Sequence, residues 1–155
     1  MNKVVLGKYV NTHGLKGEIR IKSNFKYKDK VFQINNEIII DSKTYKIMSY
    51  RVHKDYDMVT LEGINSIEEI PFMKNTKVYI DRDKYLNNNE YLDSDLIGFT
   101  VKSKYLNKKL TSINYITKTK KLLECEDSLV PYELITNIDF DNKIITIKDV
   151  KGLWK

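Results

Sequence analysis

Short segments with strand patterns follow one another along most of this chain of 155 residues. The clearest is Glu18–Lys22, where Ile19 and Ile21 alternate with charged residues and therefore face one side of a half-buried strand. Similar segments are expected at 4–6, 37–40, 44–52, 59–62, 76–80, 96–101, 110–117, 121–125, 134–138 and 144–148. Only residues 64–73 show helical spacing, and Pro71 should shorten or break that helix. Strands without intervening helices predict an all-β fold.

The composition agrees with a β-rich globular protein. The chain has no alanine, the best helix former, but 19 isoleucines and 11 tyrosines, which favour strands. An AT-rich genome would produce part of the same bias. Hydrophobic residues make up 41% of the chain, which is too many for a disordered protein, and no apolar run is long enough to cross a membrane.

A polar segment divides the chain. Residues 81–95 have no periodicity and contain three consecutive asparagines. We therefore expect two small β-barrels, a first domain over residues 1–84 and a second over residues 96–155, joined by a linker at 85–95. Tight turns are expected at Asp41–Lys43 and at Phe140–Lys143.

Positive charge is concentrated near the N-terminus. Residues 1–30 contain eight basic and two acidic residues, a balance of +6 that equals the net charge of the whole chain. A localised basic face indicates an anionic partner, with nucleic acid as the first candidate. A solvated surface that aids solubility explains the same charge, and the charge alone favours neither interpretation.

The residues offer little for catalysis. His13 and His53 are scattered, and Cys125 lies between two glutamates that disfavour its thiolate. Neither a metal-ligand cluster nor a phosphate-binding or nucleotide-binding motif is present. We therefore predict a protein that is not an enzyme, with no catalytic residue, no metal and no cofactor.

The cellular compartment is inferred from two features. A single cysteine cannot form an internal disulfide, and residues 1–10 lack the long apolar stretch of a signal peptide. We expect a cytoplasmic protein without membrane attachment.

Two segments are candidate contact sites. In the turn after the first strand, Gly14 and Gly17 flank Leu15 and Lys16, which should be exposed at the tip. The turn is either a contact loop or a hairpin whose glycines serve geometry only. Near the end of the linker, Glu90-Tyr91-Leu92 places an aromatic and an aliphatic side chain in polar surroundings, either as binding anchors or as packing between the two halves.

Several motifs, in this order along the chain, resemble the RimM family of bacterial ribosome maturation factors. They are Gly7–Glu18 (GKYVNTHGLKGE), Glu62-Gly63-Ile64 before a short acidic helix, Glu90-Tyr91-Leu92, Asp95-Leu96-Ile97-Gly98, Val130-Pro131 and Gly152-Leu153. The first motif and the Tyr91–Gly98 region together are specific. The family usually has two adjacent aromatic residues in its linker, whereas here the second is Leu92.

The resemblance implies a six-stranded N-terminal β-barrel followed by a C-terminal PRC-type β-barrel. It also implies a monomeric, non-enzymatic assembly factor and chaperone. Such a factor binds ribosomal protein nineteen in the head of the immature small ribosomal subunit and assists rRNA folding and processing. The partner-binding residues expected from these motifs are His13, Gly14, Leu15, Lys16, Gly17, Arg20, Tyr91, Leu92, Asp95, Leu96 and Gly98.

The alternative is a stand-alone RNA-binding β-barrel protein without a ribosomal protein partner. Aromatic residues interleaved on a basic strand would favour it, because bases stack on them. The basic strand Glu18–Lys22 contains none.

Overall fold

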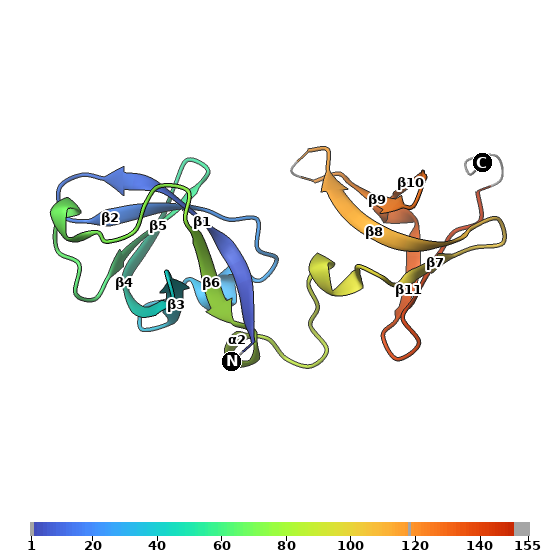
Figure 1. The fold of residues 1–155 in the computed structure, drawn as a ribbon, viewed down its shortest axis with the longest axis horizontal. Helices are drawn as coiled ribbons and strands as arrows, with labels where there is room; N and C mark the ends of the chain where they lie inside the picture. The colour runs from blue at the N-terminus through green and yellow to red at the C-terminus, as the bar shows by residue number, and fades with distance from the viewer. Residues whose placement is uncertain (1, 118, 151–155) are drawn as a thin grey trace. The chain divides into compact units, whose positions relative to one another are not determined.

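The computed structural model describes residues 2–117 and 119–150, so Gly152 and Leu153 of the family motifs lie outside the described residues. The chain forms two compact units, each with its own hydrophobic core (Figure 1). The first ends at Glu90 and the second begins at Tyr91. Within the described residues, no helix is both long and apolar enough to span a membrane.

The first unit is a closed, antiparallel β-barrel. Its strand order is β1-β2-β5-β4-β3-β6, and pairing of β1 with β6 closes the ring. The six strands are β1 (Lys3–His13), β2 (Glu18–Lys22), β3 (Glu37–Ile40), β4 (Lys43–His53), β5 (Tyr56–Leu61) and β6 (Lys77–Asp81). The expected six-stranded barrel is therefore confirmed.

The alternation seen in the sequence builds the core of this barrel. Ile19 and Ile21 of β2 are both 0% exposed, and burial of such a side chain contributes about 1.5–3 kcal/mol. The ring of Phe72 packs edge-on against Tyr9 at 4.8 Å and against Tyr45 at 5.9 Å between ring centroids. The segment before β6 thus contributes to the barrel core.

The helix predicted over residues 64–73 is much shorter than its sequence pattern and ends before Pro71, the residue expected to shorten it. Only Ile67–Glu69 forms a single turn of 3₁₀ helix. Met73, which helical spacing would bury, is exposed, whereas Phe72 is buried in the core. An extended chain around Pro71 brings Phe72 inward, and this tertiary contact outweighs the weak helical pattern.

The turn between β3 and β4 forms where it was expected. Asp41 and Ser42 have φ angles of 51° and 65°, and Ile40 pairs directly with Lys43. Two consecutive residues with positive φ are typical of a type I′ turn, which suits the twist of a hairpin.

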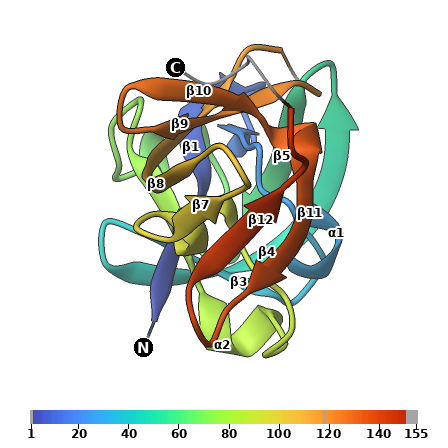
Figure 2. The same ribbon diagram turned by 90° about the vertical axis from the view of Figure 1, so that its right-hand side faces the viewer.

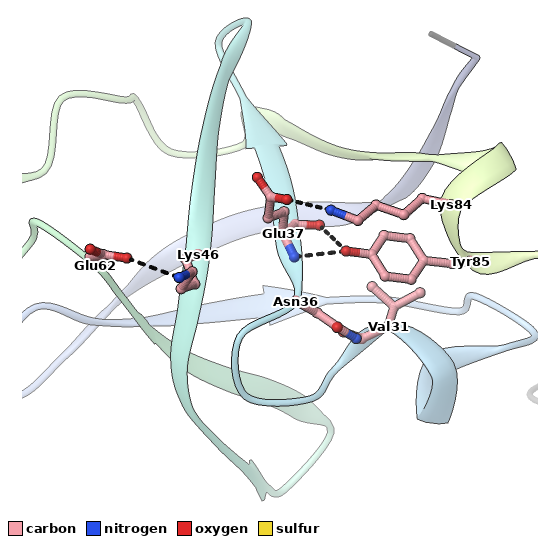
Figure 3. Close-up of polar contacts among 7 residues, drawn as sticks. All are labelled: Val31, Asn36, Glu37, Lys46, Glu62, Lys84 and Tyr85. Carbon is pink, nitrogen blue, oxygen red and sulfur yellow. Dashed lines mark hydrogen bonds and ion pairs between the residues drawn. The ribbon is translucent and has the colours of Figure 1, made fainter.

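Two one-turn helices, α1 (Lys28–Val31) and α2 (Arg82–Tyr85), were not predicted, because four residues are too few to show a helical period. Figure 3 shows how α2 is held against β3. The Tyr85 hydroxyl accepts a hydrogen bond from the Glu37 N–H at 2.8 Å and lies 3.2 Å from the Glu37 carbonyl, to which it donates. Lys84 pairs with the Glu37 carboxylate. The start of the polar segment is therefore fastened to the barrel.

The second unit is a six-stranded sheet around one core (Figure 2). Its strand order is β10-β9-β8-β7-β12-β11, with β7 and β12 parallel and the other pairs antiparallel. The strands are β7 (Thr100–Lys102), β8 (Asn107–Tyr115), β9 (Lys121–Cys125), β10 (Ser128–Pro131), β11 (Ile135–Asp139) and β12 (Ile144–Ile147). The mainly β class is confirmed, and the PRC-type assignment of this unit stays a prediction.

The entry to the second unit differs from the strand predicted over residues 96–101. A 3₁₀ turn, η2 (Asp93–Leu96), comes first, and β7 begins only at Thr100. The Asp95 carboxylate accepts a hydrogen bond from the Leu92 N–H at 2.8 Å, which stabilises the turn. The backbone of Gly98, with φ of 91°, then redirects the chain into the strand.

Candidate nucleic-acid interface

The outward side chains of β1 and β2 form one continuous strip on the first barrel. Because side chains alternate along a strand, Ile19 and Ile21 point into the core and the residues between them point out. Cross-strand pairing aligns these outward residues with those of β1. We call the resulting set the β1–β2 strip: Lys8, Asn11 and His13 from β1, and Glu18, Arg20 and Lys22 from β2.

One end of the strip continues as a row of lysines. Lys8 is the cross-strand partner of Lys22 in β2 and of Lys77 in β6, and all three side chains are exposed. Adjacent strands lie about 4.8 Å apart, and like charges placed opposite each other destabilise a sheet. Within residues 2–117 and 119–150, none of the three forms an ion pair. This lysine row is suited to an anionic partner.

At the other end of the strip, Arg20 lies in a cluster with both histidines. Its Nη2 lies 2.8 Å from Nδ1 of His13, and its Nη1 donates to Oδ1 of Asn11 at 3.3 Å. The guanidinium lies 5.8 Å from the centroid of the Tyr56 ring, within cation–π range. The rings of His13 and His53 are 5.7 Å apart between centroids. The β-barrel thus brings residues from β1, β2, β4 and β5 to one place.

A bidentate ion pair borders this cluster. Arg51 donates from Nε and Nη2 to the two carboxylate oxygens of Glu18, at 2.9 and 2.7 Å. These hydrogen bonds lower the pKa of Glu18. Partial burial, followed by the positive charge of Arg51, lowers the pKa of His53. The Glu18 charge is thus engaged by Arg51.

The glycine turn, residues 14–17, has a geometry that agrees both with a contact loop and with a hairpin whose glycines serve geometry only. Gly14 and Gly17 have φ angles of 72° and 83°. A Cβ atom on Gly17 would lie 3.1 Å from Cγ2 of Ile64, so this position also needs a residue without a side chain. Leu15 is 78% exposed and Lys16 is exposed. The glycines shape the hairpin, and its tip is open to a partner.

Part of the N-terminal positive charge is neutralised by ion pairs within the first unit. Nζ of Lys28 lies 2.7 Å from Oδ2 of Asp57, and Lys30 pairs with Glu90. The Tyr50 hydroxyl donates to Oδ1 of Asp57 at 2.6 Å. The excess charge of residues 1–30 is therefore larger in the sequence than on the surface.

In the second unit, Tyr91 lies beside an aromatic residue from a distant turn. Its ring centroid is 5.3 Å from that of Phe140, which is 45% exposed. The adjacent Asp93 is tied to the sheet, because it accepts a hydrogen bond from Lys121 at 2.8 Å and one from the Tyr132 hydroxyl at 3.3 Å. Burial is the main cause that raises the pKa of Tyr132.

The other predicted residues of this segment have different environments. Leu92 is buried, and Leu96 is fully buried in the core, so the Leu96 side chain supports the segment and cannot itself reach a partner. Asp95 caps the turn through the Leu92 N–H. Gly98 is exposed and donates its N–H to the Leu110 carbonyl at 2.8 Å.

The chain is similar to several known proteins. The family model of the RimM N-terminal domain matches residues 4–85. A ribosome maturation factor RimM from Staphylococcus aureus is 35% identical over 97% of this chain and 98% of its own. The chain belongs to the RimM family. A Staphylococcus epidermidis member is 34% identical over the same shares of the two chains. A crystal structure of the 16S ribosomal RNA processing protein RimM from Pseudomonas aeruginosa has 18% identity and a TM-score of 0.47, and the match covers 96% of this chain and 98% of that one.

RimM membership confirms the resemblance carried by the sequence motifs, but those motifs do not include all residues of the candidate interface. Lys77, Arg51 and Tyr56 lie at the β1–β2 strip although they are distant from it in the sequence. Lys77 is placed there by the pairing of β6 with β1. Tyr56 and Arg51 are placed there by the pairing of β5 with β2 and of β4 with β5. The sequence near each residue contains no signal of this register.

The structure also shows the surroundings of the possible metal ligands and of Cys125. Among the residues that it describes, no three or more His, Cys, Asp or Glu side chains are grouped so that they could hold a metal ion. Cys125 is buried, and this burial raises the pKa of its thiol to about 11.

Proposed function

We propose that this chain is a ribosome assembly factor that binds the immature small ribosomal subunit in the cytoplasm. In this proposal it attaches to the subunit head through ribosomal protein nineteen and assists rRNA folding and processing, as a monomer and without catalysis. Two facts support the proposal: the chain belongs to the RimM family, and its relatives are named ribosome maturation factors.

The first barrel supplies the contact with rRNA. The lysine row is the single observation that carries this part, because three aligned, unpaired cations suit the phosphates of an RNA backbone. Leu15 and Lys16, exposed at the turn tip beside Gly14, extend the same surface at the hairpin, whereas Gly17 is buried and shapes the turn. Phosphate contacts of this kind are independent of sequence and weaken as salt rises.

The second unit supplies the contact with ribosomal protein nineteen. Tyr91 is the anchor, and the exposed Phe140 beside it adds a second aromatic surface where Leu92 replaces the usual one. Aromatic side chains with one face packed and one edge exposed are frequent energetic centres of protein interfaces. Asp95 and Gly98 hold the backbone of this segment in place.

The factor acts by selective binding. It binds the partly assembled head more tightly than the mature head, which shifts the population of subunits towards the conformation it recognises. It leaves when mature contacts cover its binding surface. No covalent bond forms or breaks in this scheme.

Co-sedimentation with small-subunit precursors and with mature subunits tests the proposal. We expect the protein to sediment with precursors and not with mature subunits. The double variant Lys8→Gln/Lys22→Gln should bind less tightly and lower the slope of log affinity against log salt by about 1.5–2. The matched control, Lys43→Gln/Lys46→Gln, removes the same charge from exposed positions of β4 and should change binding little. Equal occupancy of both kinds of subunit, or of neither, would contradict the proposal.

A second candidate, the stand-alone RNA-binding barrel, has one observation in its favour. The ring of Tyr56 lies beside Arg20 at the strip, where a base could stack. Binding to naked RNA and to purified ribosomal protein nineteen separates the two candidates. We expect Tyr91→Ala to weaken binding to the ribosomal protein and to leave RNA binding unchanged. RNA binding without any affinity for the ribosomal protein would favour the second candidate.

A further inference from the structure

Both histidines of the chain lie in the cluster at the end of the β1–β2 strip. His13 comes from β1 and His53 from β4, and their ring centroids are 5.7 Å apart. Because a guanidinium group has donors only, the 2.8 Å contact with Arg20 requires Nδ1 of His13 to be an unprotonated acceptor.

The positive charge of Arg20 is not neutralised by a carboxylate within the described residues. Its hydrogen bonds go to two neutral groups, the Asn11 amide and the His13 ring, and its buried Nε has no hydrogen-bond partner in that part of the chain. The nearby carboxylate, Glu18, is engaged by Arg51. A half-buried guanidinium whose acceptors are uncharged gains from an anionic acceptor.

We infer that Arg20, His13 and His53 form a binding site for a backbone phosphate of RNA, and that binding is accompanied by uptake of a proton by His53. This inference rests on the proposed function, since it assigns the β1–β2 strip to RNA. Beyond the proposed function, it identifies a phosphate as the bound group and Arg20, His13 and His53 as the residues that bind it. It also makes RNA affinity dependent on pH. The site is continuous with the lysine row along the same strip.

The proton uptake follows from the charge of the bound phosphate. A phosphate oxygen replaces Nδ1 of His13 as the acceptor for Arg20, and a charge-assisted hydrogen bond is stronger than one to an uncharged acceptor. Burial and nearby cations lower the pKa of His53 in the free protein, and an anion beside the ring favours its protonated form.

The groups around the two rings come from several elements. They are Glu18 and Arg20 from β2, Arg51 from β4, Tyr56 from β5, and Lys54 from the turn between β4 and β5. Glu18 partly opposes the effect of the cations. Proton uptake therefore depends on an added anion.

Binding of a fluorescein-labelled RNA hairpin to the full chain, at constant salt, tests the inference. Between about pH 7.5 and about pH 6, we expect affinity to rise roughly five- to tenfold for one proton taken up. Calorimetry in two buffers with different ionisation enthalpies should show this uptake directly. The double variant His13→Gln/His53→Gln should bind with little dependence on pH, and Arg20→Lys, which keeps the charge, should lose most of the same dependence.

The matched control is Lys22→Gln, on the same face but outside the cluster. It should weaken RNA binding by a similar factor at every pH and leave the pH profile intact. Wild-type binding that does not change with pH, or a profile that the double histidine variant retains, would overturn the inference.

Sulfate separates RNA from a free anion, because it keeps its charge throughout this range. At constant ionic strength it should compete weakly and to the same extent with the wild type and the double histidine variant. Strong competition confined to the wild type would assign the site to free oxyanions and overturn the RNA assignment. If the pH dependence is absent but the protein still sediments with subunit precursors, only this inference fails. If the protein associates with no precursor, the proposed function itself fails.

Discussion

A buried carboxylate organises part of the first barrel. The residue Asp57 is only 3% exposed, and both of its oxygens are occupied, one by Lys28 and the other by the hydroxyl of Tyr50. A buried ion pair can be close to neutral for stability as a whole, yet removal of one partner leaves the other without compensation. The polar residues of this barrel therefore differ in how well they tolerate substitution.

Substitution of Asp57 tests this reasoning. We expect Asp57→Ala to lower the free energy of unfolding by about 3 kcal/mol, because it leaves the Lys28 ammonium and the Tyr50 hydroxyl without an acceptor. Asp41→Asn is the matched control: that exposed carboxylate lies in a turn at positive φ, which asparagine tolerates, so its effect should be close to zero. Urea denaturation followed by circular dichroism measures both. Equal effects would contradict the role given to Asp57.

The ion pair between Glu18 and Arg51 should make stability depend on pH. The folded protein lowers the pKa of Glu18 from its ordinary value of 4.5. A carboxyl group with a lowered pKa stabilises the fold above its ordinary pKa, and this contribution is lost as pH falls through the folded value. Glu18→Gln should therefore be less stable than the wild type at pH 7, and the difference should shrink below about pH 4.5. A difference that stays constant in denaturation series from neutral to acidic pH would show that the charge is not the cause.

At the level of elements, the β1–β2 hairpin depends on two glycines that differ in their surroundings. Both have positive φ, but a Cβ on Gly14 would meet nothing within 4 Å, whereas a Cβ on Gly17 would approach the backbone of Ser66 to 3.2 Å. Gly14 is required only for its positive φ angle. Gly17 is required for its positive φ angle and because a side chain would clash with its neighbours.

Alanine at each position separates the two requirements. Gly14→Ala should cost about 1–2 kcal/mol from the left-handed backbone alone. Gly17→Ala should cost about 2–4 kcal/mol, because the segment around Ile64 and Ser66 must also shift. Thermal and urea unfolding of the two variants give the comparison. If Gly14→Ala were the more damaging substitution, the packing described for Gly17 would be incorrect.

Considered as a whole molecule, the chain has two hydrophobic cores, and the boundary between the compact units follows Glu90. The first domain expected from the sequence ended at residue 84, before the linker expected at 85–95. Tyr85 bonds to the β3 backbone, and Glu90 pairs with Lys30. We propose that the first folding unit extends to Glu90.

Two fragments test this boundary. A fragment of residues 1–90 should unfold cooperatively with a β-type circular dichroism spectrum. A fragment of residues 1–84 should be less stable by about 1–2 kcal/mol, because it lacks the Tyr85 hydrogen bonds to Glu37. Equal stability of the two fragments, or an unfolded 1–90 fragment, would contradict the assignment.

Much of the strand content could be predicted, because the patterns involved are local. Glu18–Lys22 and Glu37–Ile40 form strands with the predicted bounds. The helical segment expected over residues 64–73 is shortened before Pro71, as predicted, but the burial of Phe72 in place of Met73 depends on tertiary packing that the local pattern does not show. Strand β10 (Ser128–Pro131) was missed, since four residues that depend on pairing with β9 show little period of their own.

By itself the sequence determined the class of fold, the inward and outward faces of the strand Glu18–Lys22, the tight turn at Asp41 and the family, because neighbouring residues alone carry these signals. The tertiary structure decided which charges meet. Lys77 lies beside Lys8, His53 lies beside His13, and Lys28 pairs with Asp57. The reason is physical, because strand order and register place residues from distant parts of the chain about 5 Å apart. At that distance opposite charges attract each other and form pairs, whereas like charges repel each other and favour an anionic partner.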